Sequence, residues 1–110
     1  MKVLDIPRFH LEVRPDRSRV VLCIGGELDV ATVPRVEQAV RELRESGWST
    51  IALDLGAVTF VDSTGLGALL SLHRAPPSGG CELAIGPSCP ALERLITVSK
   101  LERALPRGEL

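Results

Sequence analysis

The apolar positions near the start of the chain follow the spacing of β-strands. Residues 9–13 alternate between apolar and polar side chains, and residues 20–24 form a continuous apolar run. Turn-forming residues occupy 14–18, between the two segments. Strict alternation and short apolar runs are typical of strands. We therefore predict a β-hairpin whose second strand is central in a sheet and ends at Gly25 and Gly26.

The next segment changes to the spacing of a helix. Thr32 is placed to cap it, Pro34 lies in its first turn, and Gly47 ends it. The apolar residues that recur at helical spacing are Val33, Val36, Val40 and Leu43. Residues 50–55 then have the mostly apolar character of a buried strand. A helix between two strands predicts a right-handed parallel crossover, and so a mixed sheet.

The second half of the chain repeats the alternation of strand and helix. Residues 58–61 lead into a helix that Asp62 or Ser63 caps and that runs to about Ala75, before two prolines. A strand over residues 81–85 and another helix follow. We expect Ser88 to open that helix, with Pro90 in its first turn. Residues 101–110 offer at most a short strand around Ala104 and Leu105, with a frayed end.

These elements predict an α/β fold in one domain that spans residues 1–110, because 110 residues fit a single core and no linker or repeat divides them. Apolar residues make up 45% of the chain and charged residues 25%, as in ordinary globular domains. The net charge of −1 disfavours direct binding of nucleic acid. No stretch resembles a signal peptide or a membrane span, so we predict a cytoplasmic protein without membrane insertion.

The residues that catalysis or metal binding needs do not form a recognisable pattern. Cys23, Cys81 and Cys89 lack the spacing of a disulfide framework or a zinc site, and we expect them to be buried and reduced. His10 and His73 have no acidic or cysteine neighbour that suggests a triad. Neither a nucleophile elbow nor a phosphate loop with a lysine occurs. We predict no enzyme, no metal and no cofactor.

The junction before the second predicted helix is the chemically interesting place. Ser63 lies where a strand gives way to a helix, and the N–H groups of a first helical turn favour negative charge. Gly65 and Gly67 would leave the backbone near Ser63 uncovered, which allows another protein to approach. The alternative is that Ser63 only caps the helix and that the glycines serve packing.

Two further features of this region have open alternatives. Asp29 and Asp62 each follow an apolar strand, and they either face the same end of the sheet as Ser63 or are solvated loop acids. The helix after Ser63 is apolar around nearly its whole circumference, so it is either enclosed by its own domain or exposed for a partner. Its apolar residues are Leu66, Ala68, Leu69, Leu70, Leu72 and Ala75.

Three sequence elements together resemble the signature of STAS-domain anti-sigma factor antagonists. They are Gly-Glu-Leu-Asp at 26–29 with Ala-Thr-Val-Pro at 31–34, Leu-Asp-Leu at 53–55, and Val-Thr-Phe-Val-Asp-Ser-Thr-Gly-Leu-Gly at 58–67. The resemblance spans roughly residues 9–101, the expected core of the domain. It implies a STAS fold, with a mixed four- to five-stranded sheet and helices packed mainly on one side.

The family resemblance implies a partner-switching cycle. The unmodified protein binds an anti-sigma factor that is also a serine kinase, and so releases a sigma factor. The kinase phosphorylates the antagonist and abolishes binding, and a metal-dependent serine phosphatase restores it. Ser63 matches the phosphorylated residue, with Thr64 as a weaker alternative. The partner-binding residues implied are Asp29, Asp62, Ser63, Thr64, Gly65, Leu66, Gly67 and Leu70.

The chain also departs from this pattern. Relatives usually continue the second helix with several basic residues, whereas here His73, Arg74 and Ala75 meet a pair of prolines. The choice of partner is therefore expected to differ. The alternative function is a STAS scaffold that is never phosphorylated, in a transporter or a stress-sensing complex. A homodimer also remains open.

Overall fold

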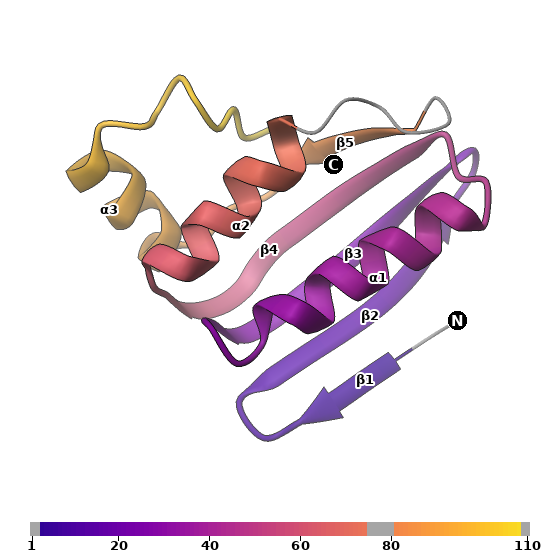
Figure 1. Cartoon of the computed structure of the whole chain (residues 1–110), viewed down its shortest axis with the longest axis horizontal. Helices are drawn as coiled ribbons and strands as arrows, with labels where there is room; N and C mark the ends of the chain where they lie inside the picture. The colour runs from indigo at the N-terminus through magenta and orange to yellow at the C-terminus, as the bar shows by residue number, and fades with distance from the viewer. Residues whose placement is uncertain (1–2, 75–80, 109–110) are drawn as a thin grey trace.

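The computed structural model describes residues 3–74 and 81–108. Within them, five strands form one mixed sheet in the order β1-β2-β3-β4-β5 (Figure 1). The strands β1, β2 and β3 pair antiparallel, and β3, β4 and β5 pair parallel. The mixed α/β sheet of the prediction is confirmed, and β3 is central as expected. The elements are β1 (Val3–Ile6), β2 (Phe9–Asp16), β3 (Arg19–Leu28), α1 (Val33–Glu45), β4 (Thr50–Val61), α2 (Ser63–Arg74), β5 (Glu82–Ile85) and α3 (Pro90–Ser99).

The predicted hairpin is confirmed, but β3 is longer than expected. We expected it to end at the two glycines, whereas it continues through them to Leu28. Gly26 has a φ of +84°, and a Cβ there would lie 2.2 Å from the Arg8 carbonyl oxygen. The register between β3 and β4 shifts on both sides of Gly26. The glycines therefore make an irregularity within the strand, and they do not end it.

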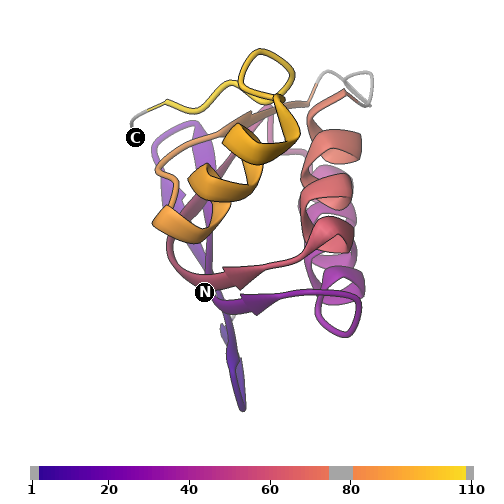
Figure 2. The same ribbon diagram turned by 90° about the vertical axis from the view of Figure 1, so that its left-hand side faces the viewer.

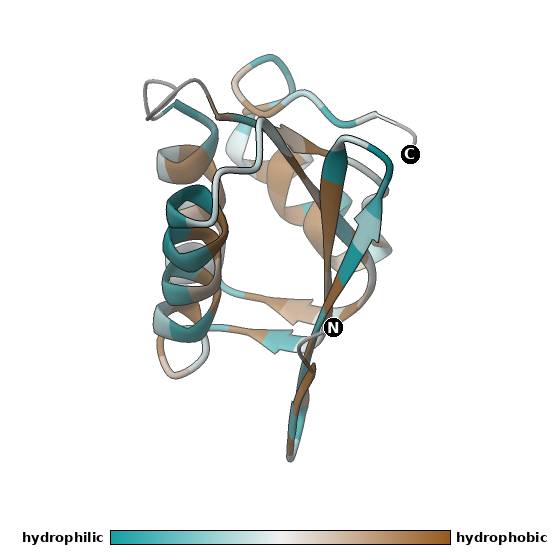
Figure 3. Cartoon of the chain, turned by 90° about the vertical axis from the view of Figure 1, so that its right-hand side faces the viewer, coloured by the Kyte–Doolittle hydropathy of each residue, from teal (hydrophilic) through white to brown (hydrophobic). Residues whose placement is uncertain are grey.

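The helices α1 and α2 cover one face of the sheet (Figure 2). Figure 3 shows that the hydrophobic side of α1 faces the strands and its hydrophilic side faces outward. Both parallel crossovers therefore lie on the same side, as expected for helices packed mainly on one side. The largest fully buried side chains of the core are Phe9, Val20, Leu22, Ile24, Leu28, Ile51, Leu53, Leu55, Leu69, Leu92, Ile96 and Leu105.

Helix α3 lies beside the half of β4 that pairs with β3 but not with β5. Strand β5 pairs only with residues 50–53 of β4. Beyond it the chain turns away, and the N–H of Leu55 donates to the carbonyl of Pro87 at 2.9 Å. The cap of α3 is Cys89, whose Sγ accepts a hydrogen bond from the N–H of Leu92 at 3.4 Å. Our prediction of Ser88 as the cap is wrong, because the hydroxyl of Ser88 donates to Glu93 instead.

The segment after α3 is not the short strand that we considered. It forms turns, and Leu105 is completely buried. Up to residue 108 the segment is held in place, because Arg107 pairs with Glu93 at 2.9 Å and the N–H of Gly108 donates to the carbonyl of Ile85. Residues 109–110 lie outside the described residues. The segment therefore packs on the domain, and Leu105 belongs to the core.

The edge strand β1 was not predicted, because four residues of alternating exposure give a weak signal. Among the cysteines, all free, Cys81 and Cys89 are buried as expected, but Cys23 is only half-buried. No helix in the described ranges has the length and apolar character needed to cross a bilayer.

Candidate functional site

The ends of β3 and β4 meet at one edge of the sheet. Leu28 is paired with Val61, the last residue of β4, and the N–H of Asp62 donates to the carbonyl of Leu28 at 3.3 Å. Asp29 follows β3 directly, and Ser63 begins α2 directly after Asp62. Asp29, Asp62 and Ser63 therefore lie at the same end of the sheet, which is the first of the two arrangements that the sequence left open.

Asp29 organises the turn between β3 and α1. One oxygen of its carboxylate accepts hydrogen bonds from the N–H groups of Ala31 and Thr32, at 2.9 and 3.2 Å. The hydroxyl of Thr32 donates to the carbonyl of Glu27 at 2.8 Å and accepts from the N–H of Asp29 at 3.0 Å. Thr32 occupies the cap position of α1, but its side chain does not cap the helix as we predicted. Its hydroxyl closes the preceding turn instead.

Asp62 caps α2. Its carboxylate accepts a hydrogen bond of 2.8 Å from the N–H of Gly65, and its carbonyl accepts the first helical bond, from Leu66, at 3.0 Å. The sequence allowed either Asp62 or Ser63 as the cap, and the structure selects Asp62. Ser63 is the first residue of the helix. The predicted end of this helix at Ala75 lies outside the described residues.

Ser63 is exposed, and its hydroxyl makes no hydrogen bond within residues 3–74 and 81–108. Thr64 is exposed as well. A capping serine would have its oxygen occupied by a main-chain N–H. Since Asp62 accepts that N–H as the cap of α2, the hydroxyl of Ser63 is accessible to a second protein.

The two glycines of α2 have different roles. A Cβ on Gly65 would lie 2.4 Å from the carbonyl oxygen of Leu28 and 3.0 Å from Cγ1 of Val61. A Cβ on Gly67 would have nothing within 4 Å. Gly65 therefore allows α2 to pack tightly on β3, and our expectation that it leaves the backbone uncovered is wrong. That expectation is correct for Gly67 alone.

Helix α2 divides into a buried side and a polar exposed side. Gly65, Leu66 and Leu69 are buried, and Leu70 is half-buried. The exposed positions are Ser63, Thr64, Gly67, Ser71 and Arg74. Its apolar side chains up to residue 74 are buried or half-buried, and its neighbouring helices are α1 and α3 (Figure 1). Gly65 and Leu66 thus shape the site from below, while Ser63, Thr64 and Gly67 form its surface.

The sequence reasoning missed two exposed apolar residues near this end of the sheet. Val30, in the turn beside Asp29, is 70% exposed, and Phe60, near the end of β4, is 48% exposed. Phe60 lines a shallow groove between β4 and α3, together with Leu95 and Val98. The sequence signal that could have revealed Val30 is its position as an apolar residue inside a turn, directly after Asp29. Large exposed apolar side chains at such a place favour protein contact.

The site contains carboxylates and hydroxyls, and the residues described include no cluster of three or more His, Cys, Asp or Glu that could hold a metal ion. Both aspartates use their carboxylates to hold the main chain. Neither is placed beside a histidine or a cysteine as an acid–base pair would be. The arrangement is suited to presenting a hydroxyl to another protein.

Comparison with known proteins gives one consistent result. A family model described as "Mlab, STAS domain" matches residues 11–107. The anti-sigma-B factor antagonist of Staphylococcus aureus (strain NCTC 8325 / PS 47) is 35% identical over 79 residues, which is 72% of this chain and 73% of that protein.

Solved structures agree with the sequence comparison. The crystal structure of an anti-sigma factor antagonist from Mycobacterium paratuberculosis superposes with a TM-score of 0.78 at 25% identity, covering 97% of this chain and 92% of that one. The anti-sigma factor antagonist SpoIIAA in its unphosphorylated form has a TM-score of 0.66 at 24% identity, covering 91% and 87%. SpoIIAA of Bacillus in the phosphorylated form has a TM-score of 0.62 at 24% identity, covering 91% and 90%. The last two likenesses concern the fold.

Proposed function

Because the chain belongs to the STAS-domain family of anti-sigma factor antagonists, we propose that it is a partner-switching antagonist controlled by phosphorylation of Ser63. In its unmodified form it binds an anti-sigma factor that is also a serine kinase, and a sigma factor is released. The protein carries out no catalysis itself. A metal-dependent serine phosphatase removes the phosphate, and the cycle runs in the cytoplasm.

One observation carries the proposal: Ser63 is exposed and its hydroxyl makes no hydrogen bond to the described residues, while its neighbour Asp62 caps the helix. A kinase can phosphorylate a hydroxyl only if that hydroxyl reaches the active site of the kinase. The open space over Gly67, one helical turn further on, allows close approach. Thr64 is exposed as well and is the weaker candidate acceptor.

The effect of phosphorylation on binding follows from charge. A phosphoryl group adds about −1.5 to −2 charges at pH 7. At Ser63 this charge lies inside the surface that the partner covers, so docking is opposed by desolvation and by repulsion from partner carboxylates. A loss of about 3 kcal/mol weakens binding more than a hundredfold. The fold changes only locally, because no hydrogen bond within the described residues involves the hydroxyl of Ser63. SpoIIAA, solved in both forms, keeps a fold similar to that of this chain in each.

The partner surface extends beyond the switch residue. Asp29 shapes the turn that presents Val30, and Leu70 lies half-buried on α2. Exposed apolar residues surrounded by polar ones are typical of a docking surface. We place the kinase over Val30, Ser63 and Gly67, with Asp29 and Asp62 positioning the main chain below.

The first experiment is phosphopeptide mass spectrometry on the protein isolated from its own cells, both growing and stressed. The expected result is phosphate on Ser63 with an occupancy that changes with condition. Consistent absence of phosphate would reject the switch and favour the alternative, a STAS scaffold subunit of a transporter or stress-sensing complex.

The second experiment measures affinity for the anti-sigma factor kinase by calorimetry. Ser63→Ala should bind like the unmodified protein, and Ser63→Asp should bind more weakly by at least tenfold. The matched control is Ser71→Asp, which adds the same charge at an exposed serine two turns further along α2. Equal affinity of the alanine and aspartate variants would contradict the mechanism. Sedimentation of the free protein would test for a homodimer.

A further inference from the structure

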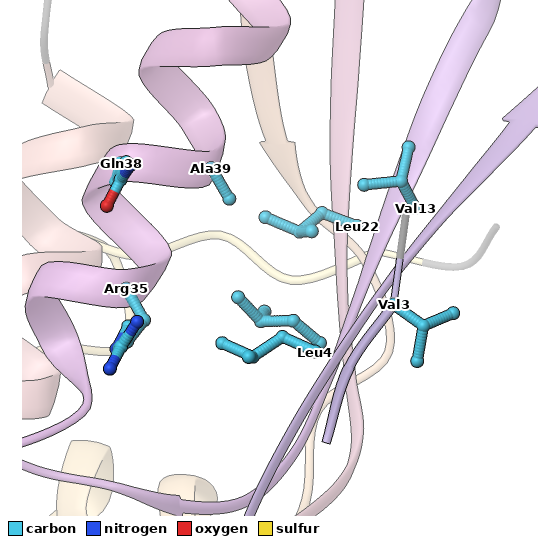
Figure 4. Close-up of a pocket in the computed structure, with 8 residues that line it drawn as sticks. Val3, Leu4, Val13, Leu22, Arg35, Gln38 and Ala39 are labelled. Carbon is cyan, nitrogen blue, oxygen red and sulfur yellow. The ribbon is translucent and has the colours of Figure 1, made fainter. Parts of the chain in front are cut away.

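A pocket lies between the sheet and α1, away from the Ser63 end of α2. It encloses about 150 Å³. Leu4, Leu11, Val13 and Leu22 line it from β1, β2 and β3, and Ala39 lines it from the helix. Figure 4 shows the side chains of Leu4 and Leu22 pointing from the strands toward α1. The wall of the pocket is therefore almost entirely aliphatic.

The pocket forms where the sheet extends past the helix that covers it. Leu4 of the edge strand β1 is paired with Leu11, so both side chains point to the same face. Leu22 is completely buried and Leu11 is nearly so, whereas Leu4 and Val13 are only half-buried. The inner end of the pocket is thus buried and apolar, and its outer end opens to solvent.

A cationic side chain, that of Arg35, lies at the mouth of the pocket. Arg35 and Gln38 complete the lining from α1, and both are exposed. Within the described residues the guanidinium of Arg35 has no carboxylate partner, while the amide of Gln38 donates to Glu42 at 3.1 Å. An unpaired arginine beside an apolar hole suits a ligand with a hydrocarbon tail and an anionic head.

The volume sets the size of the ligand. An apolar cavity of about 150 Å³ is large enough to bind a benzene molecule, and it holds about five groups of the size of water or methylene. About five carbons of a hydrocarbon chain therefore fill the pocket. A few more carbons then carry the chain to the mouth, where its carboxylate lies. We propose that this pocket binds a medium-chain carboxylate, with the tail between β1–β3 and α1 and the carboxylate on Arg35. The site is independent of Ser63 and of partner switching.

Titration of the full chain with octanoate, followed by NMR of the methyl groups, tests the proposal. The expected result is saturable shifts of the methyl signals of Leu4, Leu11, Val13 and Leu22 at millimolar octanoate or below. The neutral probe 1-octanol, with the same number of carbons, should bind about tenfold more weakly, because it cannot form the charge-assisted bond to Arg35. Absence of saturable shifts at these residues, or equal affinity for the two probes, would overturn the proposal.

Two variants separate the roles of tail and head. Ala39→Leu should fill the pocket and abolish binding, with folding checked by circular dichroism. Arg35→Gln is an exposed change that leaves the fold intact and should weaken octanoate about tenfold. The matched control Arg41→Gln removes an equal charge from the same helix at an exposed position outside this pocket, and should have no effect. Equal loss in the two arginine variants would overturn the proposed contact. If the methyl signals of the residues that line the pocket change with protein concentration alone, the pocket is an interface with a second copy of the chain. That result would reject the carboxylate as its ligand.

Discussion

The backbone of Gly65 lies so close to Leu28 that a Cβ on Gly65 would be 2.4 Å from the Leu28 carbonyl oxygen. The first turn of α2 thus packs directly on the main chain at the end of β3. The backbone fixes the position of a Cβ, and the Leu28 oxygen itself belongs to the backbone, so neither can move away as the end of a flexible side chain would. Every substitution at residue 65 must push the helix and the strand apart.

Gly65→Ala should therefore destabilise the domain by about 1–3 kcal/mol, the usual cost of overpacking. The free energy of unfolding from urea titration is the measurement. Gly67→Ala is the matched control, because its Cβ has open space around it. That variant should be more stable by about 0.5–1 kcal/mol, through its higher helix propensity. Similar effects of the two substitutions would contradict the close packing.

Asp62→Ala should cost about 0.5–2 kcal/mol, because the N–H of Gly65 loses its cap. Ser63→Ala should change the free energy of unfolding by less than about 0.5 kcal/mol, as for surface positions elsewhere. Thermal and urea unfolding of the two variants give the comparison. The reverse order would identify Ser63 as the cap and remove the basis for an accessible hydroxyl.

Leu105→Ala should destabilise the domain by about 2–5 kcal/mol, as for other fully buried leucines. Val98→Ala, at an apolar residue that is 79% exposed in the nearby helix α3, should stay within about 0.5 kcal/mol of the wild type. If the two variants have the same free energy of unfolding, Leu105 in the segment after α3 is not part of the core.

The pair of Glu93 and Arg107 gives a dependence of stability on pH. The hydrogen bonds from Arg107, and next from Ser88, lower the pKa of Glu93 below its ordinary value of 4.5. A carboxyl with a lowered pKa in the folded state stabilises the fold above its unfolded pKa, and the effect is lost as the pH falls through the folded pKa. Because the Glu93 side chain is 45% exposed, we expect only about 0.5 kcal/mol.

The measurement for this pair is urea unfolding at neutral pH and at about pH 3. Glu93→Gln should be less stable than the wild type at neutral pH, and the difference should shrink in acid. Glu102→Gln, an exposed change in the adjacent segment, serves as the control for the loss of one negative charge. A gap between wild type and Glu93→Gln that stays constant with pH would contradict the lowered pKa.

The sequence was most informative where spacing alone decides the structure. The alternation in residues 9–13 and the helical spacing after Thr32 each predicted the correct element, and the order of elements then required parallel strands and a mixed sheet. The sequence could not say that β3 passes through Gly26, because a glycine ends a strand or distorts it according to what lies opposite. Here that neighbour is Arg8, in the turn after an edge strand that we did not predict.

At the site, the common position of Asp29 and Asp62 was one of two arrangements that the sequence left open. It follows from the pairing of β3 with β4, because parallel strands end at the same edge of a sheet. The choice between Asp62 and Ser63 as the cap could not be predicted, because both side chains can accept the same N–H. The burial of Gly65 and Leu66 depends on which faces of α2 meet α1 and the sheet. That is a property of the assembled domain, and the apolar pattern around the whole helix concealed it.

The separation of the cap from the exposed serine has a consequence for how such proteins diverge. Asp62 is under constraint from the fold, whereas Ser63 is exposed and its hydroxyl makes no hydrogen bond to the described residues. After a gene duplication, one copy can exchange Ser63 for alanine, threonine or an acidic residue with little loss of stability. Under the proposed switch, a lineage can thus fix the regulator permanently on or off through one codon, without any compensating change elsewhere.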